Sequence, residues 1–418
     1  MKTKKVLVVG GGGREHAIVD ALSRSSQVEK IYAAPGNAGI ALQAECVAIK
    51  DTDIEALARF AADHSIDLTV VGPEAALACG IVDLFRQKGL AIFGPDKAAT
   101  RIESSKEFAK QLMTDHNIPT ARYASFDNYE AAAQYIASHG IPTVIKYDGL
   151  AAGKGVVVAT TAAEADAALR DMLLDDKFGA GRVIIEECLV GPEFSFMCFV
   201  DGDRVYPMQI AQDHKRAFDG DHGPNTGGMG AYSPVPFISS DDVEYAFNQI
   251  MCPTAKAMAD SGIPFTGVLY GGLMKTASGI KVIEFNARFG DPETEVVLPR
   301  LESDIYDIFY AVATHTEMPA IAWSAQAAVG VVLASKGYPE AYEKGAQIDG
   351  LDSLNAKAYH MGTAVKDGKF VTNGGRVLFI TAMAPTVAQA RQMANAEVAK
   401  VQCDNLFHRS DIGWQAVK

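Results

Sequence analysis

The sequence predicts an α/β protein that begins with a doubly wound parallel sheet. Two features of the first hundred residues support this prediction: short apolar strands alternate with helical patterns, and each strand runs into a Gly or Pro turn. Alternation of this kind is typical of parallel sheets, in which each crossover helix packs back onto the strands. Such sheets bind ligands at the carboxyl ends of their strands, so a binding edge is expected where the turns meet.

The elements of this first unit follow in order along the chain. Apolar runs predict strands at residues 6–9, 31–34, 68–71 and 91–94, and helices are expected from residue 14, near 53–64 and from residue 75. The turns that follow the strands read GGGG, PGNAG, GPEA and GPDK. Four flexible turns are therefore expected at one edge of the sheet.

Composition excludes several classes of function. The chain has 418 residues, which suggests two to four domains, and a net charge of -13, which argues against nucleic acid or an anionic membrane as a partner. Its six cysteines are scattered without a CxxC pair, so neither a structural zinc site nor a disulfide framework is expected. No secretory signal or stretch of membrane-spanning length is recognised, and a cytoplasmic location is the default expectation.

The GGGG turn at residues 10–13 does not match a dinucleotide-binding motif. Glu15 or His16 occupies the last position of G-x-G-x-x-G/A, and the acidic residue expected about 20 positions later is absent. Backbone N–H groups at the start of a helix still offer an anion site. Glu15 either serves that site or complements the helix dipole, and His16 is equally open to a structural or a functional role.

A second glycine-rich turn, GLAAGKG at residues 149–155, joins two predicted strands, 144–146 and 156–160. A Walker A loop needs G-x-x-x-x-G-K-[ST] at the start of a helix, so this turn does not match one. Its backbone amides and Lys154, together with Lys146, could close over phosphates, and a plain hairpin turn is the alternative. The sequence leaves both possibilities open.

Two polar segments follow. The strand at 182–189 contains Glu186 and Glu187, and Glu193 follows the next turn, a pattern that fits either an adenosine pocket or an exposed turn. Residues 211–236 have the polarity of a loop but exceed the length of a simple connection, so a functional segment is expected. Asp213 and Lys215 could bind a charged substrate there.

The stretch KVIEFNARFGDPETE at 281–295 predicts the floor of a site. In a strand, Glu284, Asn286 and Arg288 share one face. A carboxylate and a carboxamide suit Mg²⁺, and the guanidinium suits a phosphoryl group held by that ion. The alternative is a solvated strand face with a salt bridge.

The remaining elements complete the chain. The strand at 265–276 is expected to form a hairpin with the 281–287 strand around Gly279, after a helical region near 241–261. A change in character after about residue 319, with strands at 327–335 and 376–384 and a helix to about residue 402, predicts a further unit.

Several motifs occur together in one order. They are GGREHA at 12–17, APGNAG at 34–39, VGPEA at 71–75, GLAAGKGV at 149–156, QDHKR at 212–216, GPNTGGMGAYSP at 223–234 and RFGDPE at 288–293. With these motifs the chain resembles, over essentially its full length, the phosphoribosylamine–glycine ligase family of the ATP-grasp superfamily. The resemblance implies an N-terminal substrate-binding domain at 1–102, an ATP-grasp domain at 103–326 with a mobile lid at about 122–192, and a small C-terminal α+β domain at 327–418.

The resemblance also implies a reaction. ATP drives the joining of glycine to 5-phosphoribosylamine through a glycyl phosphate intermediate, giving glycinamide ribonucleotide, ADP and phosphate in de novo purine synthesis. The expected metal is Mg²⁺ or Mn²⁺, and the expected assembly is a monomer or weak dimer. The residues agree with this chemistry, because phosphoryl transfer needs positioned charge more than a covalent nucleophile.

Site residues follow from the resemblance position by position. Arg288, Lys154 and Asp213 are expected to be catalytic, and Glu284 and Asn286 are expected to bind the metal. The nucleotide positions are Lys106, Lys146, Gly149, Gly153, Lys154, Gly155, Glu186, Glu187, Leu189 and Glu193. The substrate positions are Gly12, Glu15, Asn37, Asp213, Lys215, Asn225, Thr226, Gly227, Gly228, Met229, Asp291, Pro292 and Glu293.

Three rival functions are compatible with parts of this sequence. Another ATP-grasp ligase, such as a biotin carboxylase or a formate-using purine enzyme, would lack QDHKR and GPNTGGMGAYSP. An NAD-dependent oxidoreductase is disfavoured by the broken glycine motif. A non-catalytic nucleotide-binding module would have little use for the metal pair, the lid lysine and the arginine together.

One departure from the family pattern is Glu295, where Gln or Met is usual; this carboxylate could perturb the substrate pocket or be exposed.

Overall fold

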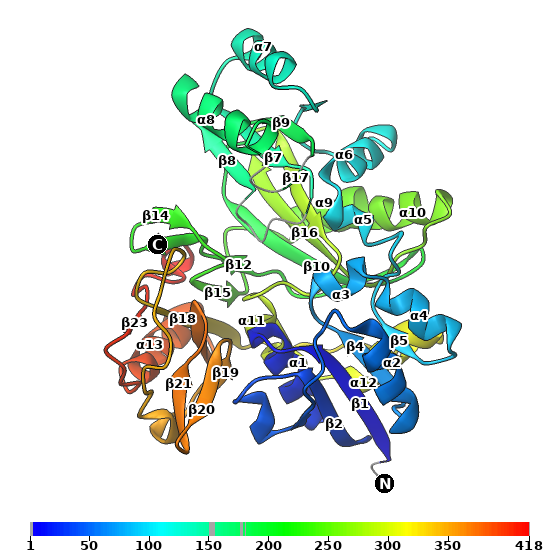
Figure 1. The fold of residues 1–418 in the computed structure, drawn as a ribbon, viewed down its shortest axis with the longest axis vertical. Helices are drawn as coiled ribbons and strands as arrows, with labels where there is room; N and C mark the ends of the chain where they lie inside the picture. The colour runs from blue at the N-terminus through cyan, green and yellow to red at the C-terminus, as the bar shows by residue number, and fades with distance from the viewer. Residues whose placement is uncertain (1–2, 150–154, 176–178, 180, 418) are drawn as a thin grey trace.

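A computed structural model describes residues 3–149, 155–175, 179 and 181–417. The expected lid positions Gly153 and Lys154 lie outside the described residues. The protein is a mixed α/β structure with a parallel N-terminal sheet and a small C-terminal unit, which confirms the predicted fold class (Figure 1).

The first unit is a five-stranded parallel sheet in the order β3-β2-β1-β4-β5. Its elements are β1 (Lys4–Gly10), α1 (Gly13–Ser23), β2 (Val28–Pro35), β3 (Glu45–Cys46), α2 (Ile54–Asp63), β4 (Leu68–Val71), α3 (Glu74–Ala78), α4 (Ile81–Gln87) and β5 (Ile92–Phe93). All four predicted strands are present. The edge strand β3 was missed because its two residues form no apolar run.

Alternate side chains of β1 point into two different hydrophobic cores. Val6 and Val8 lie in the same cluster as Leu22 of α1. Leu7 and Val9 lie in a second cluster, with residues of α2 and α4. Both faces of the central strand are therefore covered by helices, as a doubly wound sheet requires.

The middle of the chain contributes two four-stranded sheets, β6-β9-β7-β8 and β11-β10-β16-β17. Its elements are α5 (Arg101–Ser104), α6 (Lys106–Asp115), β6 (Tyr123–Phe126), α7 (Tyr129–His139), β7 (Thr143–Tyr147), β8 (Val156–Ala159), α8 (Ala162–Leu173), β9 (Val183–Glu187), β10 (Glu193–Asp201), β11 (Arg204–Pro207), α9 (Ser240–Ala246), α10 (Cys252–Asp260), β16 (Thr266–Thr276) and β17 (Gly279–Asn286). In Figure 1 the sheet of β7, β8 and β9, with α7 and α8, lies at the end of the molecule farthest from the N-terminal sheet.

The hairpin of β16 and β17 contains a β-bulge. Gly272 pairs with Glu284 and Leu273 pairs with Val282, so Ile283 is the extra residue. The sequence predicted the hairpin around Gly279 but not this interruption of the alternation. A bulge bends the strand and redirects the side chains beside it, and bulges are common next to active sites.

The segment 211–236, which has the polarity of a loop, contains four short strands. They are β12 (Gln212–Asp213), β13 (Arg216–Phe218), β14 (His222–Asn225) and β15 (Gly230–Ser233). β12 and β15 join the sheet of the C-terminal unit, where β15 pairs with β18 (Ala327–Ser335). A Cβ at Gly230 would collide with Ile412, so this glycine permits the close packing of β15.

The rest of the chain adds α11 (Thr294–Val297) and α12 (Ile305–Thr314), which packs against β5, β10 and β16, and then completes the C-terminal unit. The elements of that unit are β18, β19 (Lys357–His360), β20 (Thr363–Lys366), β21 (Lys369–Thr372), β22 (Arg376–Ala384), α13 (Val387–Val398) and β23 (Leu406–Phe407). Single-turn helices lie at Ile40–Leu42, Leu298–Arg300, Leu351–Ser353 and Trp414–Val417, and Phe247–Met251 joins α9 to α10. The C-terminal unit lies beside the N-terminal sheet (Figure 1), and Asn37 Nδ2 donates to the His360 carbonyl at 2.7 Å. Within the described ranges, no helix is both long and apolar enough to cross a membrane.

Candidate active site

The carboxyl end of β17 holds an arginine in a fixed position. Arg288 Nη2 donates to Asn286 Oδ1 at 3.0 Å and lies 2.9 Å from Glu103 Oε1. Arg288 Nε lies 3.5 Å from Glu74 Oε2. Two carboxylates from α3 and α5 therefore hold the guanidinium at the end of the strand, and Asn286 and Arg288 converge as predicted. Sequence reasoning missed Glu103, which belongs to no motif, and assigned no role to Glu74 of VGPEA.

Glu284 lies among positive charges. Burial would raise the pKa of its carboxyl, but the charges of Lys215 and Lys146 outweigh this effect and lower the pKa. Lys106 also contributes to this lowering, and its Nζ donates to the Gly149 carbonyl at 3.0 Å. The carboxylate of Glu284 is consequently ionised at neutral pH.

A buried cluster of charged side chains connects β17 to the sheet β6-β9-β7-β8. Lys146 Nζ donates to the Ile283 carbonyl at 2.9 Å and lies 2.9 Å from Glu186 Oε1. The other oxygen of Glu186 lies 2.9 Å from Lys110 Nζ. Burial lowers the pKa of Lys110 to about 8, although Glu186 opposes the shift. The Glu186 side chain, expected in an adenosine pocket, is thus committed to two lysines, and Lys110 was missed because α6 gives it no motif.

Asp213 and Lys215 extend from β12 toward the same region. Burial and the nearby Glu293 raise the pKa of Asp213 to about 7, even though Lys215 opposes the shift. Lys215 Nζ lies 3.0 Å from Glu193 Oε2. A carboxyl with a pKa near 7 can accept or donate a proton at neutral pH.

The GDPE turn after Arg288 is fixed by contacts with three other elements. Glu293 Oε1 accepts hydrogen bonds from Ser195 at 2.8 Å and from Tyr270 at 2.7 Å. Asp291 Oδ1 lies 3.0 Å from Arg376 Nη2, and a Cβ at Gly228 would collide with Pro292. The turn and the NTGGMG segment therefore pack together.

Arg376, at the start of β22, joins these two segments. Its Nη1 donates to the Gly227 carbonyl at 2.6 Å and to the Asp291 carbonyl at 3.2 Å. The Gly227 N–H donates to Tyr338 Oη at 2.9 Å. Sequence reasoning missed Arg376, because only the packing of the C-terminal unit brings it to the site.

The other residues of the polar segment differ in exposure. Thr226 Oγ1 donates to the Lys215 carbonyl at 2.9 Å, and Met229 is completely buried. Asn225 is exposed at the end of β14.

Three residues expected to bind the nucleotide lie in or beside the sheet β6-β9-β7-β8. Glu187 lies 3.4 Å from Arg122, Leu189 is half-buried, and the Gly155 carbonyl accepts from the Tyr147 N–H at 2.8 Å.

The glycine turn of the N-terminal sheet is closed by its own residues. Glu15 Oε2 accepts from the Gly12 N–H at 2.6 Å, and Glu15 Oε1 accepts from Arg14. Asn37 donates to the Gly11 carbonyl at 2.9 Å and accepts from the N–H groups of residues 39 and 40. Glu15 thus caps α1, and Asn37 shapes its own turn.

His16 has a structural role. Its Nδ1 accepts from the His360 N–H at 2.8 Å, and burial lowers its pKa to about 3, so the ring is neutral.

An open cavity of about 540 Å³ lies between the PGNAG turn and the C-terminal unit, with Gly11, Asn37 and Gly362 in its lining. The two units therefore leave room for a small ligand beside the glycine turn.

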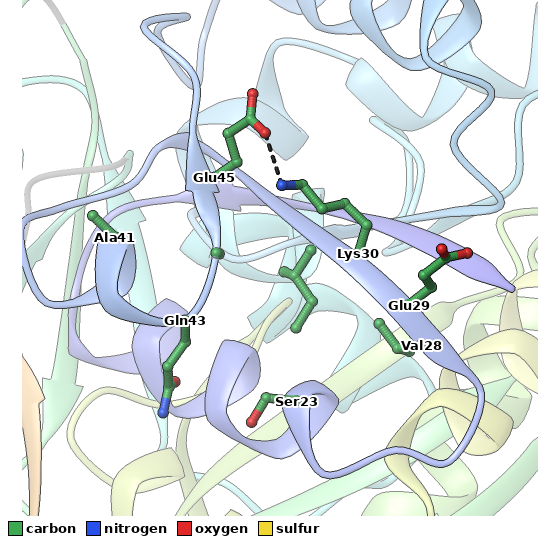
Figure 2. Close-up of a pocket in the computed structure, with 9 residues that line it drawn as sticks. Ser23, Val28, Glu29, Lys30, Ala41, Gln43 and Glu45 are labelled. Carbon is green, nitrogen blue, oxygen red and sulfur yellow. Dashed lines mark ion pairs between the residues drawn. The ribbon is translucent and has the colours of Figure 1, made fainter. Parts of the chain in front are cut away.

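Figure 2 shows a different hollow, of about 430 Å³, along β2 and β3. Lys30 and Glu45 form an ion pair there at 2.8 Å, with both side chains near half exposed. Its other lining residues include Ser23, Val28 and Gln43. Among the described residues, no hydrogen bond or ion pair joins these side chains to Glu284, Asn286 or Arg288, so this hollow is not part of the candidate site.

The donors at the end of β17 fit a magnesium-type ion. Glu284 supplies an ionised carboxylate, and Asn286 Oδ1 accepts one hydrogen bond from Arg288, which leaves a lone pair. Within the described part of the chain, no group of three His, Cys, Asp or Glu residues could hold a metal alone. One carboxylate and one carboxamide suit Mg²⁺ that takes its remaining ligands from phosphates and water.

Comparisons with known proteins agree with this geometry. Models of the N, ATP-grasp (A) and C domains of phosphoribosylglycinamide synthetase match residues 4–103, 104–294 and 328–415. A phosphoribosylamine–glycine ligase from Halalkalibacterium halodurans is 54% identical over 99% of this chain and 97% of its own length, and one from Pseudomonas aeruginosa is 49% identical over 99% and 98%.

Solved structures agree as well. A phosphoribosylamine–glycine ligase from Thermotoga maritima superposes with a TM-score of 0.86, at 32% identity over 98% of this chain and 100% of that one. A biotin carboxylase from Campylobacter jejuni shares the fold, with a TM-score of 0.75 at 14% identity over 97% and 93%. The site and these likenesses together place the chain in the phosphoribosylamine–glycine ligase family.

Proposed function

We propose that this protein uses ATP to join glycine to 5-phosphoribosylamine, giving glycinamide ribonucleotide, ADP and phosphate in de novo purine synthesis. The observation that carries the proposal is the convergence of Asn286 and Arg288 beside the ionised Glu284, at the end of one strand and among buried lysines. The family membership of the chain supports the same reaction. A carboxylate is a poor electrophile, so glycine is first phosphorylated to glycyl phosphate.

The nucleotide lies over β17 in this proposal. Lys106 and Lys146 bind its phosphates, while Gly149, Gly155, Glu187 and Leu189 lie along its length. Mg²⁺, or Mn²⁺, bound by Glu284 and Asn286 would neutralise charge on the phosphates. The buried lysines and the donor set of β17 support this arrangement.

Arg288 contacts the transferred phosphoryl group. A carboxylate oxygen of glycine attacks the γ-phosphorus, the bond to the β-phosphate oxygen breaks, and ADP leaves. The guanidinium is already fixed by Glu74 and Glu103, so it stabilises the developing charge without first reorganising.

Asp213 acts in the second step. The amine of phosphoribosylamine attacks the carbonyl carbon of glycyl phosphate, the amide bond forms and phosphate leaves. Asp213 accepts the proton that the amine loses, for which its pKa of about 7 is suited. Lys215 orients the carboxylates near it.

The phosphoribosyl group lies between the glycine turn and the GDPE turn in this scheme. Backbone N–H groups at the start of α1 favour an anion, and Glu15 already accepts from one of them, the Gly12 N–H. Asn37, the 225–229 segment and residues 291–293 form the surrounding walls. Support comes from the hydrogen bonds and contacts that bring these segments together.

The remaining parts of the proposal concern organisation. We assign substrate binding to 1–102, ATP-grasp chemistry to 103–326 and the supporting unit to 327–418. The protein acts as a monomer or weak dimer in the cytoplasm. The ranges of the matched family domains support the division into three parts, and the assembly and location rest on the expectation from sequence.

The test measures phosphate release from ATP with each reactant omitted in turn. We expect turnover only when Mg²⁺, glycine and phosphoribosylamine are all present. Undiminished turnover without glycine would refute the ligase function. Replacing glycine with alanine or serine tests substrate choice in the same assay, and a formate- or bicarbonate-dependent reaction would instead favour another ATP-grasp ligase.

A further inference from the structure

Glu295, in the short helix α11, is completely buried against the first turn of α1. A Cβ at Gly13 would collide with Oε1 of Glu295, so this oxygen lies directly beside the helix N-terminus. The Met361 side chain approaches the same position at Gly13. The carboxyl group therefore occupies the interior wall behind the glycine turn.

Neither carboxyl oxygen of Glu295 has a hydrogen-bond partner among the described residues. A buried, unpaired carboxylate is costly, because its charge has lost its hydration. Burial raises the pKa of Glu295 well above its ordinary value, and the charge of Asp291 adds to that effect. The protonated, neutral carboxyl has a lower free energy in this buried position than the ionised one.

The groups around Glu295 come from four elements. Asp291 and Glu293 of the GDPE turn disfavour its charge, while Arg376 of β22 favours it. Arg376 is already paired with Asp291 at 3.0 Å, so it offers Glu295 only partial compensation.

Tyr359 of β19 also faces Glu295, and burial raises the pKa of its hydroxyl well above the ordinary value. On α1, the side chains of Arg14 and Glu15 pair with each other. His16 and His360, which lie near Tyr359, have pKa values lowered by burial to about 3 and about 4, so neither titrates near neutral pH. Burial thus raises the pKa of Glu295 well above its ordinary value, and it also raises the pKa values of Asp213 and Glu103.

The charge state of Glu295 matters to any anion at α1. The N-terminus of an eleven-residue helix favours negative charge, and an ionised Glu295 would supply that charge from within the protein. A phosphate bound outside the same turn would then meet both repulsion and a partly neutralised helix dipole. A protonated Glu295 adds no further negative charge to a turn at which Glu15 already accepts from the Gly12 N–H.

We propose that Glu295 is a positioning residue that permits binding of the phosphoribosyl substrate at the N-terminus of α1 only while it carries a proton. The proposal rests on the proposed function, which places the phosphate of phosphoribosylamine at this turn. It makes the affinity for that substrate fall as pH rises and leaves ATP and glycine, which bind near β17, largely unaffected.

The test compares the KM for phosphoribosylamine from about pH 6 to about pH 9 in the wild type and in Glu295→Gln. Gln is neutral at every pH, so the variant should lack the rise in KM that the wild type shows in the alkaline range. We expect the two to differ by about tenfold at the alkaline end, the size of effect that one added like charge beside the ligand produces. The phosphate of the substrate also titrates, near pH 6, but identically in both assays.

A readout without substrate accompanies the kinetics. Protonation of a group with a raised pKa stabilises the folded state at low pH, and this contribution is lost as pH rises through the folded-state pKa. The melting temperature of Glu295→Gln should therefore gain on that of the wild type as pH increases. Glu295→Met serves as the second variant if Gln impairs folding, and Glu317→Gln, at an exposed position, should keep the wild-type profile.

Each outcome has one meaning. A flat KM profile in Glu295→Gln against a rising one in the wild type supports the proposal. Parallel KM profiles in a protein that shows the full ligase turnover overturn it, even if the melting temperatures diverge, because Glu295 would then affect stability alone. Absence of turnover dependent on glycine and phosphoribosylamine would instead refute the proposed function.

Discussion

Lys146 Nζ donates a hydrogen bond to the backbone carbonyl of Ile283 at 2.9 Å. Ile283 is the extra residue of the bulge in β17, so it has no partner in the register with β16. The bulge thus joins β17, which carries the proposed metal ligands, to Lys146 of β7. Because Glu186 of β9 forms an ion pair with the same lysine, Lys146 contacts both four-stranded sheets.

Replacing Lys146 should weaken ATP binding. In Lys146→Met the phosphates lose a charge-assisted contact, and we expect the KM for ATP to rise about ten- to hundredfold. Glu186 keeps its ion pair with Lys110, so the protein should remain folded. Lys30→Met, in the exposed pair with Glu45, is the matched control. It should leave the KM for ATP unchanged and alter the free energy of unfolding by no more than about 1 kcal/mol. An unchanged KM in Lys146→Met would remove this lysine from the nucleotide site.

The metal requirement should depend on the two oxygen donors of β17. Glu284→Gln replaces an ionised ligand with a neutral one, so we expect half-maximal activity to need about tenfold or more Mg²⁺. Asn286→Asp should shift the same titration, since it adds a charge beside Arg288. Glu340→Gln, at an exposed position, is the control. Wild-type Mg²⁺ titration curves in both β17 variants would contradict the metal assignment.

Arg288 should affect turnover more than binding. Lysine cannot span Asn286, Glu103 and Glu74 at once, so Arg288→Lys loses the fixed geometry of the guanidinium. We expect kcat to fall about 10²–10³-fold with little change in the KM for ATP. Arg170→Lys, in the exposed pair with Asp166, should leave kcat unchanged. A rise in KM at constant kcat would instead make Arg288 a ground-state binding residue.

Asp213 should give the reaction a pH dependence. If it accepts a proton, kcat/KM rises with pH through about 7 in the wild type, and this limb disappears in Asp213→Asn. Stability should change in the opposite sense. The folded-state pKa is raised, so the stabilisation from protonation is lost as pH rises through about 7. Asp213→Asn should therefore gain stability over the wild type between about pH 4 and about pH 7, measured by thermal unfolding. A retained kinetic limb would assign the base to another group.

The sequence predicted the N-terminal sheet well because its signals are local. Each strand of β1, β2 and β4 is an apolar run that ends at a glycine or proline turn. The convergence of Asn286 and Arg288 was predictable for the same reason, since it follows from alternation along one strand.

The features that sequence reasoning missed depend on contacts between distant segments. β15 is a strand because its backbone pairs with β18, about a hundred residues later, and its glycine and small residues give no strand pattern of their own. Glu103, Lys110 and Arg376 reach the site only through the packing of α5, α6 and β22. Glu295 lies four residues after a recognised motif, but its burial against α1 comes from the tertiary structure.

The central claim is that glycine is activated by phosphorylation of its carboxylate. The most direct measurement uses glycine labelled with ¹⁸O in both carboxylate oxygens and follows the label by mass spectrometry of the phosphate released. Attack of a labelled oxygen on the γ-phosphorus, followed by loss of phosphate from the acyl carbon, predicts one ¹⁸O atom in each phosphate formed. Phosphate that carries no label during full ligation would contradict the account.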